Sequence, residues 1–292
     1  MQVAGWLPAS RLSLVRAIRE SPLHVSRLSS QPMTLRRFNH IFQSDHRTLI
    51  VACDHGMISG PDRGIERMAT TLDRVIAGGV DAIMASYGTA QRFAGKLARV
   101  GLVLRIDGAA SILGPKGGAG GQFYTVEDAL RLGADALCVT AFPGSPVEED
   151  TLRVLAHVIR QAHAWGIPVM AEMVPGGFDS GPEHRTVETV SISARVAAEL
   201  GADWVKVPYV DGFEMVVQKC YVPVVVLGGP ARAEPRATLD MVSDAMKAGA
   251  AGAVVGRNVW KAEDPTAMAT ALVSIIHQDA SVASEMAVSG SI

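Results

Sequence analysis

The chain alternates short apolar runs with longer amphipathic stretches over most of its 292 residues. The runs are rich in Val, Ile, Leu and Ala and nearly continuously apolar, as expected for parallel strands buried on both faces. Eight strands that alternate with helices predict an α/β fold, a single (β/α)8 TIM barrel. The runs span 48–53, 81–85, 102–106, 135–141, 167–174, 203–208, 222–227 and 251–255.

The stretches between the runs have the periodicity of helices. Apolar residues recur there at spacings of three and four. Several of these stretches end in a glycine that leads into the next strand, as in the Gly-Ala-Asp segments at 133–135 and 201–203. A glycine just past a helix provides the left-handed cap. We expect helices over 63–77, 147–165, 187–200, 236–248 and 265–278.

A doubly wound open sheet is the alternative fold. Its Gly-x-Gly-x-x-Gly fingerprint would follow the first strand, but Asp54-His55-Gly56 stands at that place. The barrel is therefore favoured.

Residues 1–32 differ from the rest, with four arginines and a single acid, Glu20. Such a bias resembles an organelle transit segment. A translated extension ahead of a start at Met33, or an arm that covers the base of the fold, would also explain it. We expect an N-terminal extension over 1–32, disordered or absent from the mature protein, and one TIM-barrel domain over 33–292.

Composition excludes several classes of partner. The net charge of −2 argues against a nucleic-acid-binding or acidic-membrane surface. No apolar stretch reaches the roughly 18 to 20 residues that cross a bilayer. The three cysteines show no CxxC spacing, which is typical of reduced thiols in the cytosol. We therefore expect a cytoplasmic protein that binds neither membrane nor nucleic acid.

Lys206 stands in the middle of the sixth apolar run. Lysine is almost never fully buried without a partner or a function, because its ammonium loses hydration. Burial would lower its pKa and produce a neutral amine able to attack a carbonyl carbon. The position predicts imine (Schiff-base) chemistry.

Glu172 occupies a similar place in the fifth run. A buried carboxylate is unfavourable unless it pairs with a cation or carries a proton. Neighbouring strands lie about 4.8 Å apart, so Glu172 and Lys206 meet if both side chains point inward. Glu172 would then move the proton during C–C cleavage, or form a purely structural ion pair.

Functional groups of a barrel gather where strands end, on the C-terminal face. Asp54 follows the first run, where it would orient substrate hydroxyls or hold the lysine in its protonation cycle, unless it merely forms a turn. His55 is the one histidine at an expected strand end. The histidines show no HxH or HExxH spacing, so we expect no metal and no other cofactor.

Two glycine motifs suggest a phosphate site. Gly228 and Gly229 end the seventh run, and Gly256 and Arg257 end the eighth. Backbone N–H groups at such glycines can approach an anion closely, and barrels often bind phosphate between these two loops. Arg257 adds a permanently charged fork. The glycine-rich segment 114–121 is expected to be a flexible loop, with Lys116 as a weaker phosphate candidate.

Taken in order, these residues resemble the class I aldolase superfamily of archaeal-type fructose-bisphosphate, deoxyribose-phosphate and tagatose-bisphosphate aldolases. The resemblance covers about 48–277 and extends to the aminodideoxyheptulosonate synthases and the thiolase-like enzyme that degrades phosphorylated autoinducer. It is carried by Asp54-His55-Gly56, Gly133-Ala134-Asp135, Lys206 with Tyr209, Val226-Leu227-Gly228-Gly229-Pro230 and Val255-Gly256-Arg257-Asn258.

The resemblance implies a TIM barrel in which Lys206 forms an imine with a phosphorylated keto substrate. It places the phosphate on Gly228, Gly229, Gly256 and Arg257. It also implies a homo-oligomer, since archaeal-type members often form decamers.

The chain departs from this pattern at the end of the fifth run. Archaeal-type enzymes carry Tyr-Pro-Arg-Gly there, and the Tyr acts as acid/base, whereas this chain has Val174-Pro175-Gly176-Gly177. Glu172 resembles the glutamate of tagatose-bisphosphate aldolase. We therefore expect Glu172 as the proton carrier, with Tyr209 and Asp54 behind it.

Three functions stay open. The first is an aldehyde-lyase that reversibly cleaves a C–C bond through Lys206. The second is an acyl or ketol transferase that uses the same lysine and an acceptor such as coenzyme A or an amino-keto acid. The third is a non-catalytic barrel that binds a phosphorylated ligand.

Overall fold

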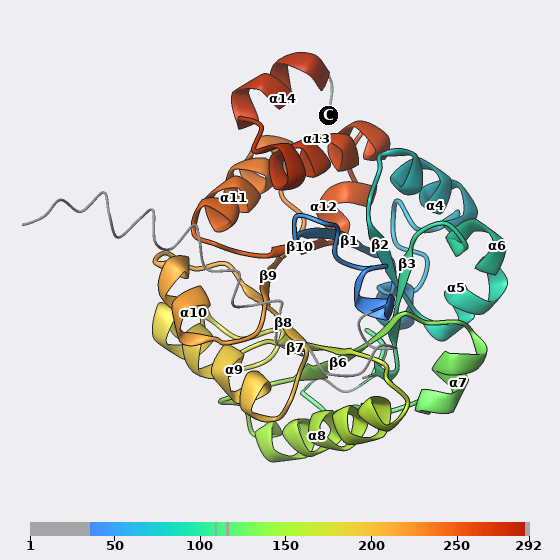
Figure 1. Ribbon diagram of the computed structural model, residues 1–292, viewed down its shortest axis with the longest axis vertical. Helices are drawn as coiled ribbons and strands as arrows, with labels where there is room; N and C mark the ends of the chain where they lie inside the picture. Colours follow the sequence, from blue (N-terminus) through green and yellow to red (C-terminus); the bar gives the residue numbers. More distant parts are fainter. Residues whose placement is uncertain (1–35, 109, 115–116, 290–292) are drawn as a thin grey trace, which may run out of the picture.

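The computed structural model describes residues 36–108, 110–114 and 117–289. Eight parallel strands close into a barrel in the order β1-β10-β9-β8-β7-β6-β3-β2 (Figure 1). The closed barrel confirms the TIM-barrel prediction and rules out an open doubly wound sheet. The barrel strands are β1 Thr48–Ala52, β2 Ala82–Ala85, β3 Gly101–Arg105, β6 Ala136–Ala141, β7 Val169–Met173, β8 Trp204–Pro208, β9 Val224–Leu227 and β10 Gly252–Val255.

Helices form the outer ring around these strands (Figure 1). The five expected long helices are present as α4 Met68–Ala77, α8 Glu148–Ala164, α9 Val187–Glu199, α11 Pro235–Lys247 and α13 Pro265–Gln278. Shorter elements were not predicted, because two to eight residues hold little periodicity. These are α3 Gly56–Ser59, α5 Tyr87–Arg92, α6 Ala94–Leu97, α7 Val126–Arg131, α10 Phe213–Lys219, α12 Arg257–Trp260, α14 Val282–Ser289, the 3-10 turn Pro182–His184 and the hairpin of β4 Asp107–Gly108 and β5 Gly121–Gln122.

One helix boundary was predicted wrongly. The helix expected from residue 63 begins only at Met68. Gly64 lies between these positions with φ +94°, and a Cβ on it would approach the backbone oxygen of Trp260 to 2.2 Å. The preceding segment is therefore a turn packed against α12 rather than the first turn of α4.

An aromatic plug fills the base of the barrel. Phe38 and Phe42 stack with their centroids 4.3 Å apart. Each meets the edge of the Trp204 ring, at 5.6 and 5.5 Å. Trp204 is two residues before Lys206 on β8, so alternation along the strand puts both side chains inside the barrel. The plug thus forms the floor below the lysine.

The aspartates of the recurring glycine segments have a common structural role. Each carboxylate accepts a hydrogen bond from a backbone N–H at the start of a neighbouring strand. Each also pairs with a histidine side chain. The contacts are Leu49 N to Asp81 (2.6 Å), Leu102 N to Asp135 (3.0 Å) and Val169 N to Asp203 (2.7 Å), with His277, His40 and His163 as the respective histidines.

Two expectations fall outside the described residues. They concern the extension over 1–32 and phosphate binding by Lys116. Within the part of the chain that the structure covers, no helix combines the length and the apolar character that a membrane crossing requires.

Candidate active site

Lys206 lies inside the barrel on β8, and only 5% of its surface is exposed. The strand register pairs it with Glu172 on β7. Its Nζ is 2.5 Å from Oε1 of Glu172. The structure therefore brings together the two buried charges that the sequence placed on adjacent strands.

Arg105 is the centre of this cluster, although it was not predicted as a site residue from the sequence. Its Nε donates to Oδ2 of Asp54, and its Nη2 donates to Oε2 of Glu172. Its Nη1 donates to Oδ1 of Asp107 at 3.0 Å and to Oγ1 of Thr140 at 2.6 Å. One buried guanidinium thus joins side chains from the segment after β1 and from β4, β6 and β7.

A signal for Arg105 was present in the sequence. It lies near the end of the third apolar run, the kind of position that drew attention to Glu172 and Lys206. Asp107 follows two residues later, on the same side of an extended segment. Asp107 also accepts the backbone N–H of Thr140 at 2.7 Å, which fixes its carboxylate.

The carboxyl groups of the cluster differ in their protonation tendencies. Burial would raise the pKa of Glu172, but Lys206 and Arg105 outweigh it and lower the pKa to about 2. Asp54 is also buried, yet Arg105 and then His55 hold its pKa well below the usual range. For Asp107, burial outweighs Arg105 and raises the pKa. Glu172 and Asp54 are therefore carboxylates at neutral pH.

The resting lysine is part of an ion pair. A carboxylate at contact distance favours the ammonium form, whereas burial alone favours the neutral amine. The amine becomes a nucleophile only after its proton has moved, and Oε1 of Glu172 is in place to accept it.

His55 extends the cluster toward α12. Its Nδ1 is 3.3 Å from Oδ1 of Asp54. Its ring meets the edge of Trp260 with centroids 5.5 Å apart, and the Trp260 indole donates to the Ala52 carbonyl at 3.0 Å. A Cβ on Gly256 would lie 2.8 Å from Cε1 of His55 and 2.9 Å from the Ala52 oxygen. Glycine at 256 therefore leaves the room that the imidazole occupies.

The loops after β9 and β10 are tied together. Asn258 donates from Nδ2 to the carbonyls of Gly228 (2.8 Å) and Pro230 (3.0 Å). Arg257 donates from Nη2 to the Gly229 carbonyl at 3.3 Å. Nε of Arg257 is buried without a hydrogen-bond partner among the described residues. An unsatisfied buried donor beside two glycines is suited to an anion.

Tyr209 is not part of this arrangement. It is three residues after Lys206, so it lies on the opposite side of the strand. Its ring stacks on Phe213, with centroids 5.6 Å apart. Burial and then the charge of Asp244 on α11 raise its pKa. The structure directs this phenol toward the surrounding helices rather than toward the lysine.

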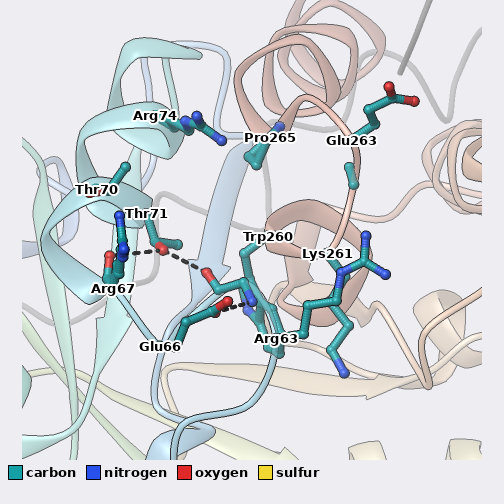
Figure 2. Close-up of a pocket in the computed structure, with 12 residues that line it drawn as sticks. Arg63, Glu66, Arg67, Thr70, Thr71, Arg74, Trp260, Lys261, Glu263 and Pro265 are labelled. Atoms are coloured by element: carbon teal, nitrogen blue, oxygen red, sulfur yellow. Dashed lines mark hydrogen bonds between the residues drawn. The ribbon is translucent and has the colours of Figure 1, made fainter.

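A separate hollow of about 380 Å³ lies between α4 and the segment after α12. Arg63, Arg67 and Arg74 line it together with Trp260 (Figure 2). None of the buried cluster around Arg105 lines it, so it is distinct from the Lys206 site. Among the described residues, no three His, Cys, Asp or Glu side chains are grouped in a way that could hold a metal ion.

A sequence profile for DeoC/LacD family aldolases matches residues 48–262. The chain belongs to this family. The resemblance seen in the sequence is thereby confirmed, and with it an aldolase-family enzyme on a TIM barrel.

The matches to individual relatives and solved structures cover most of this chain and most of the other protein. It is 38% identical to 2-amino-3,7-dideoxy-D-threo-hept-6-ulosonate synthase 1 of Archaeoglobus fulgidus, covering 83% of this chain and 90% of the relative. It is 34% identical to the 3-hydroxy-5-phosphonooxypentane-2,4-dione thiolase of Photorhabdus laumondii subsp. laumondii, covering 83% and 82%. A solved Schiff base-forming fructose-1,6-bisphosphate aldolase superposes with a TM-score of 0.75 at 31% identity, covering 84% of this chain and 100% of the other.

Proposed function

We propose that the chain is a class I aldolase, a metal-independent aldehyde-lyase in which Lys206 forms an imine with a phosphorylated keto substrate. The observation that carries the proposal is the buried Nζ of Lys206 at 2.5 Å from Oε1 of Glu172, inside the barrel. The barrel resembles that of a Schiff base-forming aldolase. A lysine with a proton acceptor in contact is the minimal equipment for imine formation.

Imine formation begins with a proton transfer. Lys206 gives one proton to Glu172, and its free electron pair forms a C–N bond with the substrate carbonyl carbon. The carbonyl oxygen takes up the proton, giving a carbinolamine. Glu172 then takes a second proton from the nitrogen and delivers it to that hydroxyl, so that water leaves as the protonated imine forms. Glu172 is the group in contact with the reacting nitrogen, so it holds and returns the proton in these steps.

Cleavage uses the positive imine as the electron acceptor. A base removes the proton of the hydroxyl on the carbon beyond the scissile bond, the C–C bond breaks, and its electron pair moves into an enamine on Lys206. An aldehyde leaves, the enamine carbon is protonated, and water releases the ketone. Asp54, held by Arg105 and His55, is placed to orient substrate hydroxyls in this sequence.

We assign the substrate phosphate to Gly228, Gly229, Gly256 and Arg257. The support is the buried Nε of Arg257, which lacks a hydrogen-bond partner among the described residues. Gly229 adds support, because its φ is +71° and the space where a Cβ would stand is open. Charge-assisted hydrogen bonds from a guanidinium suit a phosphate dianion.

Borohydride trapping tests the lysine. The protein is incubated with ketose phosphates and with triose phosphates, reduced with borohydride, digested and read by peptide mass. An adduct on the peptide that contains Lys206 is expected, and Lys206→Met should abolish it. An adduct on another lysine, or turnover that survives in Lys206→Met, would refute the mechanism.

An acyl or ketol transferase on the same lysine is the second candidate. It is favoured by the relatives named as a heptulosonate synthase and as a thiolase. Absence of the Tyr-Pro-Arg-Gly segment at Val174-Pro175-Gly176-Gly177 also separates this chain from the archaeal-type aldolase pattern. Product analysis with and without coenzyme A, or with and without an amino-keto acid, distinguishes the two. Product that forms only with an acceptor identifies the transferase.

We also propose the small-molecule partners, the cellular location and the oligomeric state of the protein. Small phosphorylated keto and aldehyde compounds are the partners, and the cytoplasm is where we place the protein. A homo-oligomer, with a decamer as the archaeal-type precedent, is proposed from the family resemblance. Light scattering after size-exclusion chromatography would contradict this if it gave the monomer mass of 30.8 kDa.

A further inference from the structure

Arg105 links side chains from different parts of the barrel interior. It projects from β3, and its hydrogen bonds reach Asp54 at the end of β1 and Glu172 on β7, which lie on opposite sides of β3 in the barrel order. Only 8% of its surface is exposed. All five N–H donors of its guanidinium have acceptors: Asp54 for Nε, Asp107 and Thr140 for Nη1, and Glu172 with the Met84 sulfur at 3.9 Å for Nη2, so none is left for substrate in this arrangement.

The two oxygens of Glu172 have separate partners. Oε1 faces Nζ of Lys206 at 2.5 Å. Oε2 accepts from Arg105 and from Oγ1 of Thr140, the latter at 3.2 Å. A carboxylate with one oxygen held in this way cannot rotate freely, so the other oxygen stays directed at the lysine. Proton transfer requires this alignment to persist while the substrate changes.

We propose that Arg105 is a positioning residue for the proposed reaction, which holds Oε1 of Glu172 on Lys206 and links Glu172 to Asp54 as one unit. The inference rests on the proposed function and adds to it a residue that never touches the substrate. Arg105 acts through Glu172, the group that moves the proton, and through Asp54, the group that orients hydroxyls.

The permanent charge of Arg105 has a second effect. When Lys206 passes its proton to Glu172, both become neutral, and Arg105 remains as the cation opposite Asp54 and Asp107. The guanidinium also favours the ionised form of Glu172 and thus limits how firmly that carboxylate retains the proton. The groups that face Glu172 are Lys206 on β8, Arg105 on β3, Asp54 after β1, Asp107 on β4, and Cys138 and Thr140 on β6.

The test compares Arg105→Met, which removes the charge, with Arg105→Lys, which keeps it. In Arg105→Met we expect kcat to fall by about 10² or more. We also expect the acid limb of the kcat profile to move to higher pH by about one to three pH units, since a contacting cation is lost. Arg105→Lys should return the limb toward its original position while kcat stays reduced. Arg131→Met, on the exposed surface of α7, is the matched control and should behave like the parent.

A purely structural role gives a different result. Folded Arg105→Met with a parental acid limb, or Arg105→Lys with a limb as displaced as that of Arg105→Met, would overturn the proposal. If Arg105→Met does not fold, Thr140→Val takes its place, since it removes one contact to Oε2 of Glu172 and one acceptor of Arg105 while the charge of Arg105 stays. It should lower kcat about tenfold with folding intact, and unchanged kcat would overturn the proposal.

Trapping in the parent separates this proposal from the proposed function. A Lys206 adduct in the parent together with unaltered kinetics in the Arg105 variants refutes the role of Arg105 alone. Absence of a Lys206 adduct in the parent overturns the proposed function, and the role of Arg105 falls with it.

Discussion

Replacement of Glu172 by glutamine is the sharpest test of the buried cluster. The side chain keeps its shape but loses its charge. One of its two terminal positions becomes an NH2 group, which must face either Nζ of Lys206 or Nη2 of Arg105, and both of these are donors. In at least one of these two contacts, the amide NH2 group therefore faces another hydrogen-bond donor, which is unfavourable. The amide also cannot take the proton of Lys206.

Two magnitudes follow from this geometry. Loss of a positioned general acid/base lowers turnover by about 10²–10⁴. Removal of one partner from a buried ion pair lowers the free energy of unfolding by about 3–5 kcal/mol. We expect the lower end of that range, because Arg105 keeps Asp54 and Asp107 as ion-pair partners after it loses Glu172.

The measurements are kcat with the best trapped substrate and urea unfolding followed by circular dichroism. Glu149→Gln, on the exposed face of α8, is the control and should match the parent in both. Trapping at Lys206 should persist in Glu172→Gln at long incubation, because the lysine itself is intact. Turnover of Glu172→Gln within threefold of the parent would refute the assignment of Glu172 as the proton carrier.

Three further predictions concern the aromatic plug, the ion pair of His277 with Asp81, and Arg257 in the proposed phosphate site. Phe42→Ala empties part of the aromatic plug, and urea unfolding should show a loss of about 3–5 kcal/mol; a loss below about 1 kcal/mol would contradict the packing seen with Phe38 and Trp204. Hydrogen bonding to Asp81, opposed by burial, raises the pKa of His277. The stabilisation that His277 contributes is therefore full below its unfolded pKa near 6.5 and is lost as pH rises through the raised folded-state pKa. Over this rise in pH, the urea midpoint should fall more in the parent than in His277→Gln. Arg257→Met should raise KM for a phosphorylated substrate by about 10- to 100-fold, with a smaller change in kcat, and equal KM values would remove Arg257 from the phosphate site.

The strands of the barrel could be predicted from the sequence because each is buried on both faces. A nearly continuous apolar run between a glycine cap and a polar residue leaves little ambiguity about where a strand lies. The recurring aspartates mark the same boundary, since Asp81, Asp135 and Asp203 each bind a backbone N–H that leads into the adjacent strand. The expected run at 102–106 accordingly differs from β3 Gly101–Arg105 by one residue at each end.

The site was harder to predict, for two separate reasons. Arg105 could be noticed as a charge in an apolar run, but its role could not be predicted, because the carboxylates that it contacts come from strands distant in the sequence. Tyr209 was predicted as a site residue because it lies three positions after Lys206 in the same motif. On an extended strand, however, side chains three positions apart point to opposite sides. The first case required the fold, whereas the second could have been resolved by strand periodicity alone.

The buried position of Glu172 explains why the cluster needs so many charges. The resemblance to archaeal-type aldolases places their phenol at the position of Val174, two residues further along the strand and nearer the mouth. A neutral phenol there requires no counterion, whereas an ionised carboxylate one layer deeper is unfavourable without compensating cations. Lys206 and Arg105 supply them on the two oxygens of Glu172. The carboxylate, the lysine and the arginine therefore form an interdependent set, and our proposal that Glu172 carries the proton leaves no acid/base role for position 174.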